Sequence, residues 1–571
     1  MHDLVIRNGL VVDGTGAAAR HADVAVTDGL ISAVEPAGTN ALAWRTIDAD
    51  GLLVTPGFVD IHTHYDAQAT WDPWLTPSSW HGVTTVVMGN CGVGFAPAAA
   101  DRHDWLIALM EGVEDIPGSA MVEGIRWDWT SYPEYLDALA AKPLAIDVGS
   151  QIAHGALRGF VMGERGAANE TAHDADITAM AALVGEALRA GALGFSTSRT
   201  PLHRSKDGEL VPGTSADARE LLGIGQAIRD AGHGVFQFAP DHASVPIAEW
   251  PWMRELAALT GQPVSVNLNQ PNSAPEVWRD VLGLLEVAYA DGLPIVAQVA
   301  GRTIGILYCL HGSVHPLLFH PAYAEVAHLP MTERLARLAE PERRHRIVHD
   351  VPDDGGLFAA VVLHNLSAMW PVVGGDIDYE PSAHQSVAAL AARRGRPPME
   401  LILDQLTAGG GNGMIYAPFF NYAYGDLSMT YEATAHPHTR MGLSDAGAHC
   451  GAICDGGTPT FMLTHWTRDR TRGPKLPLEY VVHRQTQQTA SLYGLRDRGV
   501  VRPGMRADLN VIDYEALRFG VPRMAFDLPA RGRRLVQRAS GYRATFVHGV
   551  QIVADDGFTG ELPGSLLRGP R

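Results

Sequence analysis

The chain has 571 residues, of which 46% are hydrophobic, and this is ample for one large core plus a subsidiary domain. It carries 63 acidic and 44 basic side chains, a formal net charge of -19, and no Lys/Arg-rich run that would follow a phosphate backbone, so we expect no nucleic-acid partner. The N-terminus lacks a signal-peptide pattern, no apolar run reaches membrane-spanning length, and the four cysteines are too few for a disulfide scaffold. We therefore expect a soluble, cytoplasmic protein with no membrane partner.

Both ends of the chain show the alternation of short antiparallel strands. Apolar runs at 4–6, 10–12, 24–26 and 30–31 surround the turn Asp28-Gly29, and the pattern returns at 507–513, 544–548 and 550–553. Pieces of two or three strands are marginal alone. The sequence therefore predicts one small β-sandwich built from residues 1–53 and 501–571.

The middle of the chain alternates between strands and helices. A helical period covers 177–188, and a second helix is expected to open at Ser273, with Glu276 completing a capping box, and to close at Gly292. Apolar strands separated by helices indicate parallel strands covered on both faces, and eight of them favour an α/β fold of the (β/α)₈ TIM-like barrel type over 54–500. The eight strands are expected at 57–64, 82–88, 145–149, 192–197, 234–238, 263–267, 294–299 and 440–445.

Residues 301–439 interrupt this regular pattern between the seventh and eighth strands. The segment is too long for a βα loop, so we expect an insertion that acts as a lid over the barrel mouth, with the glycine-rich run 409–413 as its hinge.

The carboxyl ends of barrel strands share one face, where active sites lie. His62 and His64, two residues apart at the end of the first strand, point the same way. Together with Cys91 after the second strand and Asp445 at the eighth, they are the ingredients of a catalytic zinc site with an open coordination position. The alternative is that the histidines merely cap a strand and that Asp445 caps the turn 444–447.

Several motifs resemble those of a known enzyme family. The runs 56–64 (PGFVDIHTH), 442–447 (GLSDAG) and 502–509 (RPGMRADL) look like the amidohydrolase superfamily. The runs 89–92 (GNCG), 153–158 (AHGALR) and 191–198 (GALGFSTS) resemble its D-aminoacylase branch, the N-acyl-D-amino-acid deacylases. Together the motifs cover nearly the whole chain, and the resemblance implies a metal-dependent barrel carrying a composite β-sandwich.

The resemblance implies His62, His64, Cys91 and Asp445 as metal ligands and Asp445 also as general base. Family members use further histidines at the ends of the fifth and sixth strands, but these strands read VFQFA at 235–239 and VSVNLNQ at 264–270. Amides are poorer zinc donors than imidazole, so we expect one zinc ion rather than two. His242, on the loop after the fifth strand, is an alternative ligand.

Further polar residues near the strand ends are candidates for binding the substrate. Arg199, His203 and Arg302 could hold a substrate carboxylate, or they could form salt bridges with acidic residues at the rim. His154 could bond a substrate oxygen or support the residues that do.

These observations predict a metal-dependent amidohydrolase that cleaves a linear amide and deacylates an N-acyl (D-)amino acid. Asp445 would take a proton from the attacking water and return it to the leaving nitrogen. Two alternatives stay open: a hydrolase of cyclic or non-amino-acid amides, and a non-catalytic barrel that has lost its metal and serves as a binding or scaffold protein. The expected partner is a small-molecule amide, and assembly into a homo-oligomer is left open.

Overall fold

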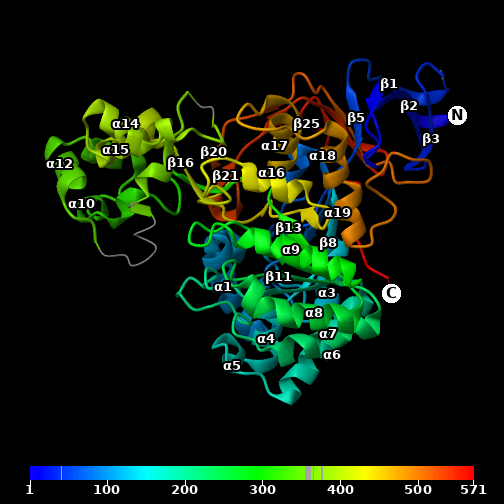
Figure 1. The fold of residues 1–571 in the computed structure, drawn as a ribbon, viewed down its shortest axis with the longest axis horizontal. Coiled ribbons are helices and arrows are strands. Elements are labelled where there is room, and N and C mark those ends of the chain that lie inside the picture. The colour runs from blue at the N-terminus through cyan, green and yellow to red at the C-terminus, as the bar shows by residue number, and fades with distance from the viewer. Residues whose placement is uncertain (40, 354–361, 364, 375–376, 571) are drawn as a thin grey trace.

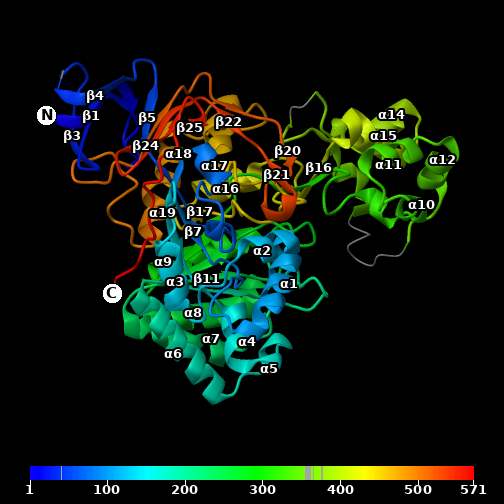
Figure 2. The same ribbon diagram turned by 180° about the vertical axis from the view of Figure 1, so that it is seen from behind.

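The computed structural model describes residues 1–39, 41–353, 362–363, 365–374 and 377–570. Figure 1 shows three parts: a body of strands and helices that includes α4 to α9, a β-rich part that holds the N-terminus, and a helical lobe that includes α10 to α15. Both chain ends lie on the side away from the lobe, as the view from behind in Figure 2 also shows.

The body contains short parallel strands that are buried almost throughout, as strands covered by helices on both faces must be. One sheet has the order β17-β13-β12-β11-β10-β9, and another has the order β6-β7-β8. In the part of the chain that the structure describes, these two sheets hold nine strands, of which all but β9 overlap one of the eight predicted segments. They are β6 (Phe58–Asp60), β7 (Val83–Met88), β8 (Asp147–Ser150), β9 (Ile152–Ala153), β10 (Gly194–Ser198), β11 (Val235–Ala239), β12 (Val264–Asn267), β13 (Ile295–Val299) and β17 (Thr439–Met441).

The chain segments that follow β6 and β17 lie side by side. The amide of Asp445 donates to the carbonyl of His62 over 3.2 Å, and the amide of His64 donates to the carbonyl of Ala446 over 2.8 Å. Thr63 and Ala446 form a parallel bridge between the two segments. Residues almost 400 positions apart in the sequence are thereby joined directly at the strand ends.

Helices cover the strands with the apolar faces that the sequence indicates. In α6, the four periodic residues Ile177, Met180, Val184 and Leu188 are all buried. The covering helices are α1 (His103–Glu114), α3 (Tyr132–Ala140), α4 (His154–Met162), α6 (Asp174–Ala190), α7 (Ala218–Ala231), α8 (Trp250–Thr260), α9 (Val277–Ala290), α18 (Leu478–Gln485) and α19 (Gln487–Leu492).

The predicted start of α9 is wrong. The helix begins at Val277, and its N-cap residue Glu276 makes no side-chain capping bond, so no capping box joins Ser273 to Glu276. Pro275 explains the difference, because a residue before proline disfavours the helical conformation and Ala274 therefore stays in a turn. The helix ends as expected, with Gly292 in the left-handed region at φ 72°.

The two ends of the chain share one nine-stranded sheet of order β25-β24-β23-β18-β5-β1-β2-β3, with β4 paired to β1. Its hairpin between β2 and β3 turns at Asp28 and Gly29, both with positive φ. That these strands pack as a sandwich stays a prediction. The strands are β1 (His2–Val11), β2 (Arg20–Thr27), β3 (Leu30–Pro36), β4 (Ala43–Asp48), β5 (Leu53–Pro56), β18 (Leu509–Ile512), β23 (Tyr542–Val547), β24 (Val550–Ala554) and β25 (Gly557–Phe558).

Residues from the segment predicted to be an insertion share an apolar core of their own, which includes Leu317, Leu338, Ile402 and Leu406. Its stem is an antiparallel pair of β14 (Ile304–Tyr308) and β16 (Ile415–Phe420), and a bridge from Phe420 to Pro271 joins the stem to the loop after β12. The lid and hinge roles stay predictions. The lobe's helices include α10 (Pro321–Ala324), α11 (Met331–Leu338), α12 (Pro341–His349), α14 (Val387–Arg394) and α15 (Pro398–Gly411).

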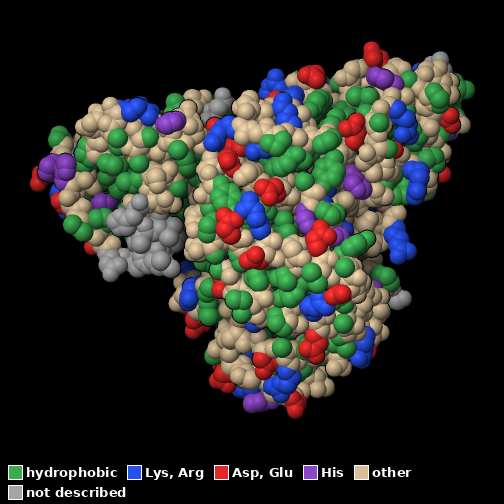
Figure 3. Space-filling view, in the orientation of Figure 1, with side chains coloured by type: hydrophobic (Ala, Val, Ile, Leu, Met, Phe, Trp, Pro, Cys, Tyr) green, Lys and Arg blue, Asp and Glu red, His purple; other side chains and the backbone are tan. Residues whose placement is uncertain are grey.

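Among the described residues, no helix combines the length and apolar character needed to cross a membrane. On the face shown in Figure 3, acidic and basic side chains are scattered among uncharged ones. The cytoplasmic location expected from the sequence stays a prediction.

Candidate metal centre

His62 and His64 lie side by side on the segment that follows β6. Their ring centroids are 5.5 Å apart, and both side chains are almost completely buried. The backbone bonds to the segment after β17 hold both residues in extended alternation, so the two imidazoles project from the same side.

Cys91 reaches the histidines through a tight turn after β7. It has a positive φ of 55°, and a Cβ on Gly89 would lie only 2.1 Å from the carbonyl oxygen of Gln151. Only glycine fits at that close approach. The turn places Cys91 Sγ 3.2 Å from Nε2 of His62, and the sulfur and one nitrogen of each histidine lie within 4.8 Å of one another.

Asp445 completes the group from the segment after β17. Its Oδ1 atom lies 3.2 Å from Nε2 of His62 and 3.6 Å from Nε2 of His64. Asp445 and Leu443 have φ values of 46° and 55°, a left-handed backbone that costs a non-glycine residue on the order of 1–3 kcal/mol. The surrounding bonds enforce this strained turn, and the turn aims the carboxylate at the imidazoles.

The charges of this group suit a metal cation. Burial alone would raise the pKa of Asp445, but the His64 and His62 imidazoles hold it well below its usual range. Burial would also raise the pKa of the Cys91 thiol, but the same two imidazoles lower it. A thiolate, a carboxylate and two imidazoles that converge in a buried space form a donor set that zinc prefers.

Glu114, which no sequence pattern singled out, also touches the group. It is the last residue of α1, its side chain is only 2% exposed, and its Oε1 lies 3.2 Å from Nδ1 of His64. A carboxylate behind a ligating imidazole orients the ring and fixes the proton on the nitrogen it faces. The only available signal was an acidic residue within a largely apolar helix.

Three amides surround the donors on the side of β11, β12 and β13. Gln298 Oε1 lies 2.7 Å from Nδ1 of His62. The backbone amide of Cys91 donates to Gln237 Oε1 over 2.9 Å, and Gln237 in turn donates to Asn267 Oδ1 over 2.9 Å. Gln237 lies on β11 and Asn267 on β12, the fifth and sixth predicted strands, at whose ends the resemblance implies histidines in other family members.

Two of the arginines expected to bind substrate are already paired. Arg199 Nε lies 3.2 Å from Glu249, and its guanidinium also donates to the carbonyl of Ala216. Arg302 lies 2.8 Å from Asp455 and stacks over the ring of Tyr379, with its side chain 1% exposed. Both therefore form salt bridges with acidic residues, the alternative to substrate binding, although these pairs are largely buried and do not lie exposed at a rim.

His154 is engaged in a buried network. Its Nδ1 lies 2.8 Å from Thr197 Oγ1 and its Nε2 lies 2.8 Å from Glu220, which also binds Arg158. Because both ring nitrogens have protein partners, the contacts favour the supporting role for His154 over a bond to substrate.

His203 and His242 each have a polar partner at one ring nitrogen. His203 Nδ1 lies 3.0 Å from Ser198 Oγ, and burial, together with the charges of His449 and His64, lowers its pKa to about 3. Burial also lowers the pKa of His242 to about 4, and its Nε2 lies 3.4 Å from the Asn269 amide. Both rings are therefore neutral at pH 7. His242, like Asp445, lies outside the set of three donors His62, His64 and Cys91 whose ligand atoms are within 4.8 Å of one another. Unlike Asp445, it has no ion-pair contact with either imidazole among the described residues.

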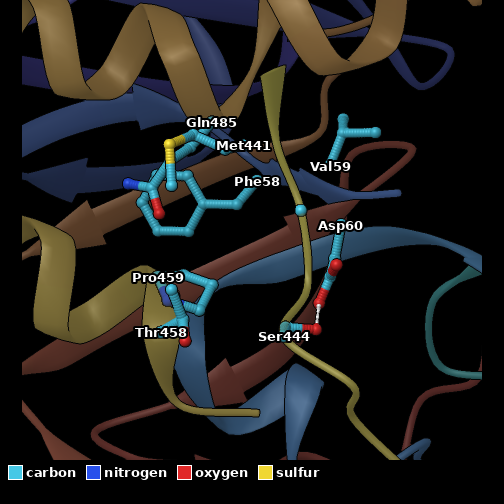
Figure 4. Close-up of a pocket in the computed structure, with 9 residues that line it drawn as sticks. Phe58, Val59, Asp60, Met441, Ser444, Thr458, Pro459 and Gln485 are labelled. Atoms are coloured by element: carbon cyan, nitrogen blue, oxygen red, sulfur yellow. Dashed lines mark hydrogen bonds between the residues drawn. The ribbon is translucent and has the colours of Figure 1, made fainter. Parts of the chain in front are cut away.

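A small cavity lies behind the donors between β6, β17 and α17 (Thr458–Phe461), and Figure 4 shows its lining. Asp60 and Ser444 point toward one another there and share a hydrogen bond, while Asp60 also accepts the amide of His62. Neither His62 nor Asp445 lines this cavity. We therefore assign Asp60 to supporting the backbone beneath the donors.

Known proteins match this chain over nearly its whole length. The profile of the amidohydrolase family matches residues 45–553. A D-aminoacylase of Alcaligenes xylosoxydans xylosoxydans is 26% identical over 578 residues, covering 99% of this chain and 97% of the relative. An uncharacterised protein of Mycobacterium tuberculosis is 28% identical over 541 residues, covering 90% and 84%.

A solved structure shares the fold along the whole chain. The N-acyl-D-glutamate deacylase of Bordetella bronchiseptica, complexed with zinc and a phosphonate inhibitor, superimposes with a TM-score of 0.66 at 24% identity and covers 100% of both chains.

Proposed function

The chain belongs to the amidohydrolase family, and from this we propose that it is a zinc-dependent hydrolase that removes the acyl group from an N-acyl amino acid. The observation that carries the proposal is that one ligand atom each of His62, His64 and Cys91 lies within 4.8 Å of the others, with the Asp445 carboxylate in contact with both imidazoles. The names of the relatives support the choice of substrate, because they include a D-aminoacylase and an N-acyl-D-aspartate deacylase. We accordingly propose that the substrate is an N-acyl-D-amino acid.

The four donors would hold a single zinc ion, which would supply Lewis-acid polarisation of the scissile carbonyl. Asp445 would take a proton from the attacking water. Oδ1 of Asp445 faces both imidazoles, so we propose that Oδ2 of Asp445 accepts this proton. The pKa of Asp445 is held low, so the carboxylate is deprotonated and can accept this proton, which it would then return to the leaving nitrogen.

The ion pairs of Arg199 and Arg302 limit the charge that the side chain of the substrate can carry. Arg199 is neutralised by Glu249 and Arg302 by Asp455, and the His203 ring is neutral, so none of these three offers a free positive charge to a substrate carboxylate, and a second carboxylate on the side chain would add a second unpaired charge. A buried charge without a partner is costly. We therefore propose that the amino acid has an uncharged side chain, unlike aspartate or glutamate.

We also propose an architecture for the whole chain. Residues 54–500 would form a closed (β/α)₈ barrel, and the bonds between the segments after β6 and β17 support the closure. Residues 1–53 and 501–571 would form the accompanying sandwich, and the shared nine-stranded sheet supports this division. Residues 301–439 would be an insertion in the barrel.

Hydrolysis assays on matched N-acetyl D- and L-leucine, with chelator-treated protein as the control, test the function. We expect turnover of the D isomer that is lost after chelation and returns with zinc. Turnover of cyclic amides but not of N-acetyl amino acids would show that the substrate is a cyclic amide. Tight metal binding without any amide hydrolysis would favour a binding protein, and failure to bind metal would reject the proposed centre.

A further inference from the structure

Gln237 and Asn267 form, with Cys91, a closed ring of hydrogen bonds beside the donors. Gln237 on β11 pairs in register with Ser265 on β12, and Asn267 lies two residues further along β12, so the two amides project from the same face of neighbouring strands. Both are almost completely buried, Gln237 at 0% and Asn267 at 5% exposure. Neither side chain can therefore turn its amide group toward solvent.

The direction of every bond in the ring follows from one backbone group. The amide of Cys91 can only donate, so the atom of Gln237 that faces it over 2.9 Å is the oxygen. The Gln237 nitrogen must then face Asn267, whose oxygen accepts over 2.9 Å. This leaves the nitrogen of Asn267 pointing at Cys91 Sγ, over 3.6 Å. The ring therefore returns to Cys91 as a donor to its sulfur.

We propose that Gln237 and Asn267 are positioning residues that fix the Cys91 sulfur for metal binding, with Asn267 donating to the side of the sulfur that faces β12. The sulfur keeps its other side toward Nε2 of His62, 3.2 Å away. Since the space beside Cys91 is filled by two neutral amides, which are poor zinc donors, no second ion binds there. This inference rests on the proposed metal centre.

Cobalt-substituted protein tests the inference, because a thiolate bound to Co²⁺ gives a charge-transfer absorption band that reports on the sulfur. Asn267→Leu keeps the size of the side chain and removes the donor. We expect the band to move to longer wavelength, since a sulfur without its hydrogen bond gives up charge more easily. We also expect metal binding to weaken by about 10- to 100-fold, the usual effect of losing a group that supports a ligand.

Gln237→Glu tests the ring itself without touching Asn267. A carboxylate accepts from Cys91 but cannot donate to Asn267, so Asn267 must turn and present its oxygen to the sulfur. The band should therefore move in the same direction as in Asn267→Leu. The control is Gln226→Leu, which changes an exposed amide on α7 and should leave the band and the affinity unchanged.

The outcomes separate the inference from the proposed function. Unchanged bands and affinities in both Asn267→Leu and Gln237→Glu would overturn the positioning role, even if the enzyme hydrolyses N-acetyl amino acids. A wild-type protein that binds Co²⁺ without the band would also overturn it, because Cys91 would not be a ligand. Loss of hydrolysis with normal bands would count against the proposed reaction and leave the ring intact.

Discussion

The Nδ1 atom of His62 lies 2.7 Å from Oε1 of Gln298. Gln298 Nε2 donates a hydrogen bond to Ser265 Oγ over 3.0 Å, so the amide oxygen of Gln298 is the atom that faces the imidazole. An oxygen only accepts, so the proton of neutral His62 is on Nδ1. The lone pair of Nε2 then faces Cys91 and Asp445, both 3.2 Å away, and the ring is set for metal binding.

Replacing Gln298 should therefore weaken the metal centre. Gln298→Leu removes the acceptor, and we expect the dissociation constant for zinc to rise by about 10- to 100-fold. Gln298→Glu keeps an acceptor and should bind zinc more tightly than the leucine variant. Competition with a chromophoric chelator measures both. Equal affinity of wild type and Gln298→Leu would refute the role of this bond.

Asp445→Asn should nearly abolish hydrolysis. The amide keeps the shape of the side chain but cannot take a proton, and general acid–base catalysis contributes about 10²- to 10⁴-fold to rate. We expect kcat to fall by at least about 100-fold while the circular dichroism spectrum stays unchanged. Near-normal turnover in the variant would remove Asp445 from the proton transfer.

Glu249→Gln should widen the range of substrates. The change frees the charge of Arg199 while the amide oxygen can still accept from Trp252. We expect kcat/KM for N-acetyl-D-glutamate to rise about tenfold relative to N-acetyl-D-leucine, near the low end for a hydrogen bond to a charged group.

The matched control for this prediction is Asp174→Asn, which frees Arg219 at an exposed ion pair. This variant should leave the ratio of kcat/KM for N-acetyl-D-glutamate to kcat/KM for N-acetyl-D-leucine unchanged. If wild-type enzyme already prefers N-acetyl-D-glutamate, the uncharged side chain that we propose for the substrate is wrong.

Glu220→Gln should lower the melting temperature in a pH-dependent way. Burial would raise the pKa of Glu220, but His154 and Arg158 lower it from 4.5 to about 2. A carboxylate with a depressed pKa stabilises the fold fully above its unfolded value and loses this effect as pH falls toward its folded value. Breaking such a buried pair costs about 3–5 kcal/mol at neutral pH.

We therefore expect the difference in melting temperature between wild type and Glu220→Gln to be constant above about pH 5 and to shrink between pH 4.5 and about 2. Scanning calorimetry at pH 7, 5 and 3 measures it. A difference that is as large at pH 3 as at pH 7 would contradict the charge pairing.

Much of the fold could be predicted because the signals are local. The apolar run before His62, the period of α6 and the turn at Asp28 and Gly29 each depend on neighbours in the sequence. The start of α9 was mispredicted because a capping pattern at Ser273 competed with the restriction imposed by Pro275, and the proline dominated.

The contacts within the site were harder to predict. The spacing of His62 and His64 indicated that they converge, but the supporting contacts depend on strand register and on turns with positive φ. Asn267 reaches Cys91 only because β11 and β12 pair in one register and Cys91 adopts a φ of 55°. Glu114 arrives from the end of α1 with no periodic signal. Such contacts between distant segments leave no trace in a single sequence.

A zinc titration of chelator-treated protein, with bound metal and hydrolysis of N-acetyl-D-leucine measured on the same samples, tests the central claim most directly. The account predicts that turnover rises in proportion to bound zinc, reaches its maximum at one ion per chain and gains nothing from further zinc. Turnover that does not depend on bound zinc, or that needs two ions per chain, would contradict it.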